Sequence, residues 1–159
     1  MPELKPYLNV LIEGLKKKNA ILNKIIVLNN KQAGVINDNN GLEAFDALVE
    51  EKAVLIAELE KVDNGFQSVY DRIKQELNLN TSQYKEEIRT LQGLIREMTD
   101  LGVSVETGEM RNKKAIEQYF SYTQKNVNMS RKSVKAASDY YKNMSRVNYI
   151  DPQLLDQKK

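Results

Sequence analysis

The sequence predicts an all-α protein, an antiparallel bundle of three long helices followed by a polar C-terminal tail. Apolar residues recur at alternating spacings of four and three over long stretches, which is the period of a helical bundle seam. Two short segments rich in Asn, near 34–41 and 78–82, interrupt these stretches. The 159 residues include only three prolines, and no useful strand-like alternation occurs. Long amphipathic helices joined by short loops stack as antiparallel hairpins.

The first helix is predicted over about 3–32. Its seam has a polar step at Lys18 and is otherwise formed by Leu4, Leu8, Leu11, Leu15, Leu22 and Ile25. Four more apolar residues widen this stripe: Ile12, Ile21, Ile26 and Leu28. A stripe of this width predicts that the helix contacts two neighbours.

The second helix is predicted over about 42–77, with Asp38, Asn39 or Asn40 as its N-cap. Its expected buried face includes Phe45, Leu48, Val49, Lys52, Leu55, Ile56, Leu59 and Val62. The stretch "VDNGF" at 62–66 disfavours helix by roughly 2 kcal/mol in summed propensity. We expect a kink or local break there but no domain boundary, because the apolar phase continues through Phe66, Val69, Tyr70, Ile73 and Leu77.

The third helix is predicted over about 81–124, after the stop signal "NLNTS". Asn80 and Gln83 resemble a capping box. The stripe then runs through Tyr84, Ile88, Leu91, Ile95 and Met98, crosses the poor helix formers around Gly102 and Gly108, and resumes at Ile116 and Tyr119. We therefore expect one helical domain over 1–125. Residues 126–159 are rich in Ser, Asn and Lys, and we expect a flexible tail.

Composition argues against enzymatic chemistry. The chain has no Cys, His or Trp, so it lacks thiolate ligands, Cys nucleophiles and the commonest general base. Nucleotide-binding, zinc-protease and hydrolase motifs are absent, and adjacent pairs such as Glu50/Glu51 point about 100° apart on a helix. We expect no catalytic residues, no metal and no cofactor.

From charge and hydropathy, we expect a cytoplasmic binding protein. Five charged residues interrupt the apolar stretch 8–28, so it predicts neither a signal peptide nor a membrane span. Residues 126–159 carry seven basic and three acidic residues, and tyrosines are interleaved with them. A single-strand nucleic-acid arm is possible on that pattern. The net +4 is modest and no cluster of five basic residues occurs, so we expect no nucleic-acid partner.

The sequence resembles flagellar type III export chaperones of the FlgN class. The resemblance is carried by the first helix with its Asn/Gly turn, by "GLEAFDALVEEKAVLIAELEKVD" at 41–63, and by "RNKKAIEQYFSY" at 111–122. It covers roughly 1–125, and the sister FliT-type class has a similar helical build. The resemblance implies a cytoplasmic chaperone that binds the C-terminal helices of hook–filament junction proteins and delivers them to the export gate. It implies the helix-in-groove mode of recognition.

The resemblance gives a hypothesis for the partner-binding surface. Tyr119 and Tyr122 share one helix face, and Phe120 points about 100° away. One face can pack on the bundle while the other meets a partner, although an aromatic cluster at a helix end also fits a satellite core. The predicted partner-binding residues are Met98, Leu101, Val105, Ile116, Tyr119, Phe120 and Tyr122, with tail contacts from Tyr140, Tyr141 and Tyr149.

Two alternatives stay open at this point. One is a FliT-type chaperone for the filament cap protein. The other is a structural coiled-coil dimer, in which Lys18 and Lys52 would be the polar residues that set the register. The chaperone hypothesis predicts a monomer or weak homodimer, and the structural hypothesis predicts a stable elongated dimer.

Overall fold

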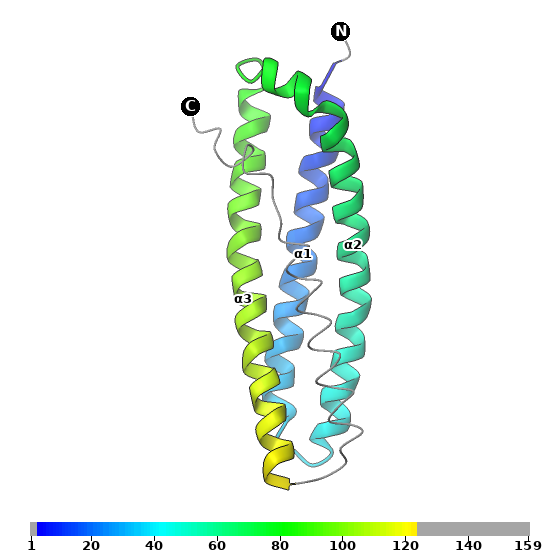
Figure 1. Ribbon diagram of the computed structural model, residues 1–159, viewed down its shortest axis with the longest axis vertical. Coiled ribbons are helices and arrows are strands. Elements are labelled where there is room, and N and C mark those ends of the chain that lie inside the picture. The colour runs from blue at the N-terminus through cyan, green and yellow to red at the C-terminus, as the bar shows by residue number, and fades with distance from the viewer. Residues whose placement is uncertain (1–2, 124–159) are drawn as a thin grey trace.

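Three long helices make up nearly all of the described chain. The computed structural model describes residues 3–123, with α1 spanning Lys5–Val35, α2 Gly41–Leu79 and α3 Lys85–Thr123. They form one elongated bundle in which α2 runs antiparallel to both α1 and α3 (Figure 1). No strand occurs within 3–123, and the predicted all-α class is confirmed.

Helix α1 is the centre of the bundle. It packs along both α2 and α3, whereas no Cα atom of α2 lies within 8 Å of a Cα atom of α3. The predicted width of its stripe accounts for this position, because Ile21 and Leu28 are buried beside the seam and Ile12 and Ile26 are partly buried. The prediction that the first helix contacts two neighbours is confirmed.

The apolar interior is divided into two parts. The main core contains eighteen buried residues and runs from Leu4 and Tyr84 to Ile25, Ile56 and Val105. The second part, called the terminal cluster below, has four: Ile36, Phe45, Ile116 and Phe120. It lies at the end of the bundle where the α1–α2 loop meets the last turns of α3 (Figure 1).

Helix α2 continues without interruption through 62–66. The local break expected there does not occur. Asp63 points inward to form an ion pair with Lys18, and Phe66 stacks on Tyr70 with 6.2 Å between ring centroids. These contacts outweigh the weak helix propensity of Asp-Asn-Gly. The last turns of α2 bend across the end of α1 toward the start of α3 (Figure 1).

The helix ends differ from the predicted caps. Asn40 precedes α2 with φ 58°, a left-handed conformation that Asn tolerates, and its side chain makes no capping hydrogen bond. The Asn80 Nδ2 group donates to the Glu76 carbonyl at 2.7 Å, so this side chain closes α2 and does not open α3. Residues 80–84 form a turn, and α3 begins at Lys85 where the sequence predicted 81.

Replacing Gly41 with alanine is expected to lower the free energy of unfolding by about 1–3 kcal/mol, the usual effect of overpacking. A Cβ atom at this position would overlap the Val35 carbonyl oxygen, so the α1–α2 loop would have to move. Urea unfolding followed by circular dichroism measures the change.

Gly65→Ala is the matched control, because a Cβ atom at Gly65 meets nothing within 4 Å inside α2. Alanine there is expected to stabilise the helix by roughly 0.5–1 kcal/mol. Equal effects of the two substitutions would contradict the loop geometry.

Candidate partner-binding end of the bundle

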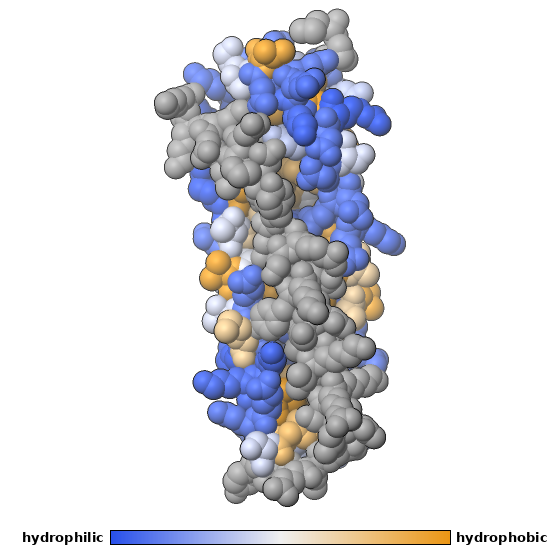
Figure 2. Space-filling view, in the orientation of Figure 1, coloured by the Kyte–Doolittle hydropathy of each residue, from blue (hydrophilic) through white to orange (hydrophobic). Residues whose placement is uncertain are grey.

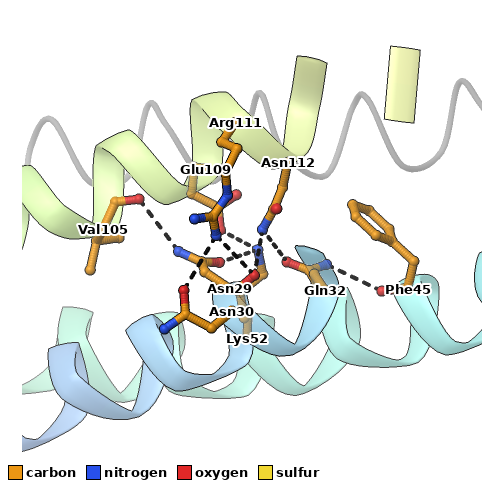
Figure 3. Close-up of polar contacts among 9 residues, drawn as sticks. All are labelled: Asn29, Asn30, Gln32, Phe45, Lys52, Val105, Glu109, Arg111 and Asn112. Atoms are coloured by element: carbon orange, nitrogen blue, oxygen red, sulfur yellow. Dashed lines mark hydrogen bonds and ion pairs between the residues drawn. The ribbon is translucent and has the colours of Figure 1, made fainter. Parts of the chain in front are cut away.

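A layer of buried polar side chains separates the main core from the terminal cluster. We call this set the polar layer; its members are no more than 3% exposed and come from all three helices: Asn29, Gln32, Lys52, Glu109 and Asn112. Figure 3 shows these side chains converging between the helices. The repeat of four and three places each of them on the inward face of its helix, where bundles usually carry apolar residues.

An ion pair at the centre of the polar layer joins α2 to α3. Lys52 Nζ pairs with Glu109 Oε1 and also donates to Asn29 Oδ1 at 2.9 Å. Burial lowers the pKa of Lys52 and raises the pKa of Glu109, because both charged forms lose hydration, while their mutual attraction opposes each shift. A buried pair of this kind contributes less stability than well-packed apolar residues of similar volume.

Amide side chains extend the polar layer across the bundle. Asn112 Nδ2 donates to the Asn29 carbonyl at 3.0 Å and to Gln32 Oε1 at 3.3 Å. Gln32 Nε2 donates to the Phe45 carbonyl at 3.2 Å, and Asn29 Nδ2 donates to the Val105 carbonyl at 3.4 Å (Figure 3). Asn112 Oδ1 is buried and accepts no hydrogen bond within the described residues. Two further buried acceptors, Asn19 Oδ1 and Asp63 Oδ2 beside the main core, likewise accept no hydrogen bond within the described residues.

A second buried ion pair lies within the main core. Lys18 Nζ and Asp63 Oδ1 are 2.9 Å apart and join α1 to α2. Burial lowers the pKa of Lys18 and raises that of Asp63, and the attraction between them opposes both shifts. The Asp63 side chain is 26% exposed, whereas Glu109 is 2% exposed. The Lys18–Asp63 pair therefore lies nearer to solvent than the Lys52–Glu109 pair, although Asp63 Oδ2 is itself buried.

The structure separates the predicted partner-binding residues into two groups. Three of them belong to the main core: Met98 and Val105 are fully buried, and Leu101 is partly buried against them. Beyond the polar layer, Ile116 is 1% exposed and Phe120 is 9% exposed.

Tyr119 completes the second group. It is partly buried against the terminal cluster, and its ring meets Phe120 edge to face with centroids 5.6 Å apart. The aromatic residues at the end of α3 therefore close the bundle, and a partner reaches Ile116 and Phe120 only where this end opens. The backbone of Tyr122 lies in α3, and Tyr140, Tyr141 and Tyr149 lie outside the described residues.

The sequence interpretation missed the acidic partners of the two seam lysines. Lys18 and Lys52 were assigned to the register of a possible dimer, but Asp63 and Glu109 of the same chain pair with them. The signal was present, because extending the repeat of four and three along each helix places Asp63 and Glu109 at inward positions. The two seam lysines, which favoured a structural dimer, are thus paired within one chain.

The visible surface of the bundle is mostly hydrophilic, with scattered apolar side chains (Figure 2). Large exposed apolar residues are spread over the three helices and the end of α2: Val10, Val27, Val54, Leu79, Val103 and Met110. No helix within 3–123 has the length and hydropathy needed to cross a bilayer. The same residues contain no group of three or more His, Cys, Asp or Glu side chains that could hold a metal ion.

These features define a small three-helix bundle whose interior is interrupted by a polar layer near one end. The model of a protein family described as FlgN protein matches residues 1–146, and the chain belongs to that family. The family is one of flagellar export chaperones, not of enzymes. No curated protein and no solved structure gave a significant match to the chain.

Proposed function

We propose that the chain is a cytoplasmic chaperone that binds the C-terminal amphipathic helices of hook–filament junction proteins. It keeps these helices from assembling early and delivers them to the flagellar export gate. The observation that carries the proposal is the FlgN family match over 1–146, which includes all three helices. The apolar face of such a helix is aggregation-prone before assembly, so a chaperone that covers it has a physical purpose.

The geometry of the bundle supports a helix as the partner. Helices α2 and α3 both pack on α1 but approach each other only through side chains, such as the Lys52–Glu109 pair. An amphipathic helix can therefore pack against α1 and α2 on the same interior without breaking a close backbone contact between α2 and α3.

The filament cap protein is the second candidate partner, because FliT-type chaperones share the helical build. Calorimetric titration of the full chain with C-terminal segments of junction proteins and of the cap protein distinguishes the two. We expect saturable binding to a junction segment and weaker binding to the cap segment. Preference for the cap protein would assign the chain the FliT-type partner.

A chain ending at Lys125 should be titrated in parallel, because loss of affinity there would show that residues 126–159, which include Tyr140, Tyr141 and Tyr149, take part in binding. Light scattering completes the test: we expect a monomer or weak homodimer that becomes a 1:1 complex. A stable elongated dimer without affinity for any segment would favour the structural alternative.

A further inference from the structure

The two ends of α3 are held in different ways. Its first half packs in the main core through fully buried residues such as Leu91, Ile95 and Met98. Beyond Gly108, it is held by the polar layer, by Arg111 Nη2, which donates to the Asn29 carbonyl at 3.3 Å, and by Ile116, Phe120 and the partly buried Tyr119. Polar contacts exchange readily for contacts with water, so the free energy that holds the second half is the smaller of the two.

The position of Gly108 separates the two halves. Gly108 is buried against the side chain of Asn29, and a Cβ atom there would lie 3.0 Å from Asn29 Nδ2. Gly108 therefore places no side chain between α3 and Asn29. Glycine is also the weakest ordinary helix former. The α1–α2 hairpin stays connected by its own loop at this end, and Asp38 N–H bonds the Val35 carbonyl within that loop at 3.0 Å.

From these contacts we propose that residues 109–123 of α3 detach from the α1–α2 hairpin as one unit, and that the uncovered face around Ile36 and Phe45 receives the amphipathic partner helix. The first half of this proposal concerns the chain alone. The second half rests on the proposed function, because it assigns that function a surface and a kind of ligand.

The α3 residues that now cover this face indicate which side chains a partner helix would need. Ile116 and Phe120 are spaced i,i+4, which is the spacing of the anchors in helix-in-groove recognition. Glu109 lies seven residues before Ile116 and pairs with Lys52. A helix that replaces them needs a carboxylate seven residues before its first apolar anchor and a second anchor four residues after it. The carboxylate is required because Lys52 would otherwise lose the buried countercharge that Glu109 supplies.

Native-state hydrogen exchange on the full chain without a partner tests the detachment. The expected result is one common opening constant over 112–120, at least about tenfold larger than the constants of amides around Leu91 and Ile95. It should change little with low urea, because a local opening exposes little surface. A steady gradient from Thr123 inward would indicate end fraying and overturn the proposal, as would protection equal to that of the main core.

A double variant tests whether the polar layer causes the detachment. Lys52→Met with Glu109→Leu joins the two apolar regions, and it is expected to reduce the opening constant over 112–120 by about tenfold or more. Lys18→Met with Asp63→Leu replaces the other buried pair inside the main core, and it should leave the difference between the two halves of α3 unchanged. An unaltered opening constant in the first variant would overturn the role of the polar layer. If that variant does not fold, the urea dependence of the wild-type opening constant decides whether residues 109–123 detach as a unit.

Exchange in the presence of a junction-protein segment tests the surface. Amides over 112–120 should lose protection by about tenfold or more while amides over 41–49 gain it, because the partner helix takes the place of α3. Binding with a footprint elsewhere would overturn the surface and leave the chaperone function standing. Absence of binding would count against the proposed function and leave the detachment of α3 as a separate result.

Discussion

Replacing Lys52 alone with methionine is expected to lower the free energy of unfolding by about 3–5 kcal/mol, because it leaves a buried carboxylate without a countercharge. Glu109 is 2% exposed and Lys52 is its ion-pair partner, so water cannot compensate without opening the bundle. Glu109→Leu alone should have an effect of similar size, because the lysine ammonium is then left unpaired. Urea unfolding followed by circular dichroism measures both variants.

The double variant, Lys52→Met with Glu109→Leu, is expected to unfold with unchanged stability or with a gain of about 1–4 kcal/mol. Two apolar side chains of similar volume pack against each other and avoid the loss of hydration that both charges suffer. A loss in the double variant equal to the sum of the two single losses would contradict this account of the polar layer.

Lys18→Met is the matched comparison for the single variants. Its partner Asp63 is 26% exposed, so the carboxylate regains part of its hydration when the lysine is removed. The loss of stability is therefore expected to be smaller than for Lys52→Met. An equal or larger loss would show that exposure of the acidic partner does not control the effect.

Leu22→Ala is expected to destabilise the protein by about 2–5 kcal/mol, the range for a leucine removed from a packed core. Leu22 is fully buried in the main core, on the helix that packs against both of the others. The surrounding structure relaxes only partly around such a cavity, so the loss exceeds the transfer free energy of the removed atoms.

Val27→Ala on the same helix is the control for that prediction. Val27 is 53% exposed, so its replacement is expected to change the free energy of unfolding by less than about 0.5 kcal/mol. Thermal unfolding of both variants and the wild type provides the measurement. A loss below about 1 kcal/mol for Leu22→Ala would contradict the central position of α1.

The fold followed from apolar periodicity because each helix keeps one phase over its whole length. The seam of α1 from Leu4 to Ile25 and the seam of α3 from Tyr84 to Met98 are buried as the spacing predicts. The extra isoleucines correctly indicated that α1 contacts two neighbours. Local propensity was less informative, because Asp63 is held by Lys18 in a position where its intrinsic preference opposes helix.

The polar layer could not be predicted from apolar residues alone. Lys52 was assigned to the register of a possible dimer, but it pairs with Glu109 across the bundle. Which acidic residue faces a seam lysine depends on the relative height of two antiparallel helices, and single-helix spacing does not contain that information. The aromatic residues at the end of α3 were recognised as a group, but the burial of Phe120 depends on Phe45 of α2 and on Ile36, which follows α1.

Calorimetric titration of the full chain with the C-terminal segment of a hook–filament junction protein tests the account most directly. The account predicts saturable binding with one segment per chain, and preference for the junction segment over the filament cap segment. Absence of binding to every segment, by protein whose circular dichroism shows the folded helical bundle, would contradict it.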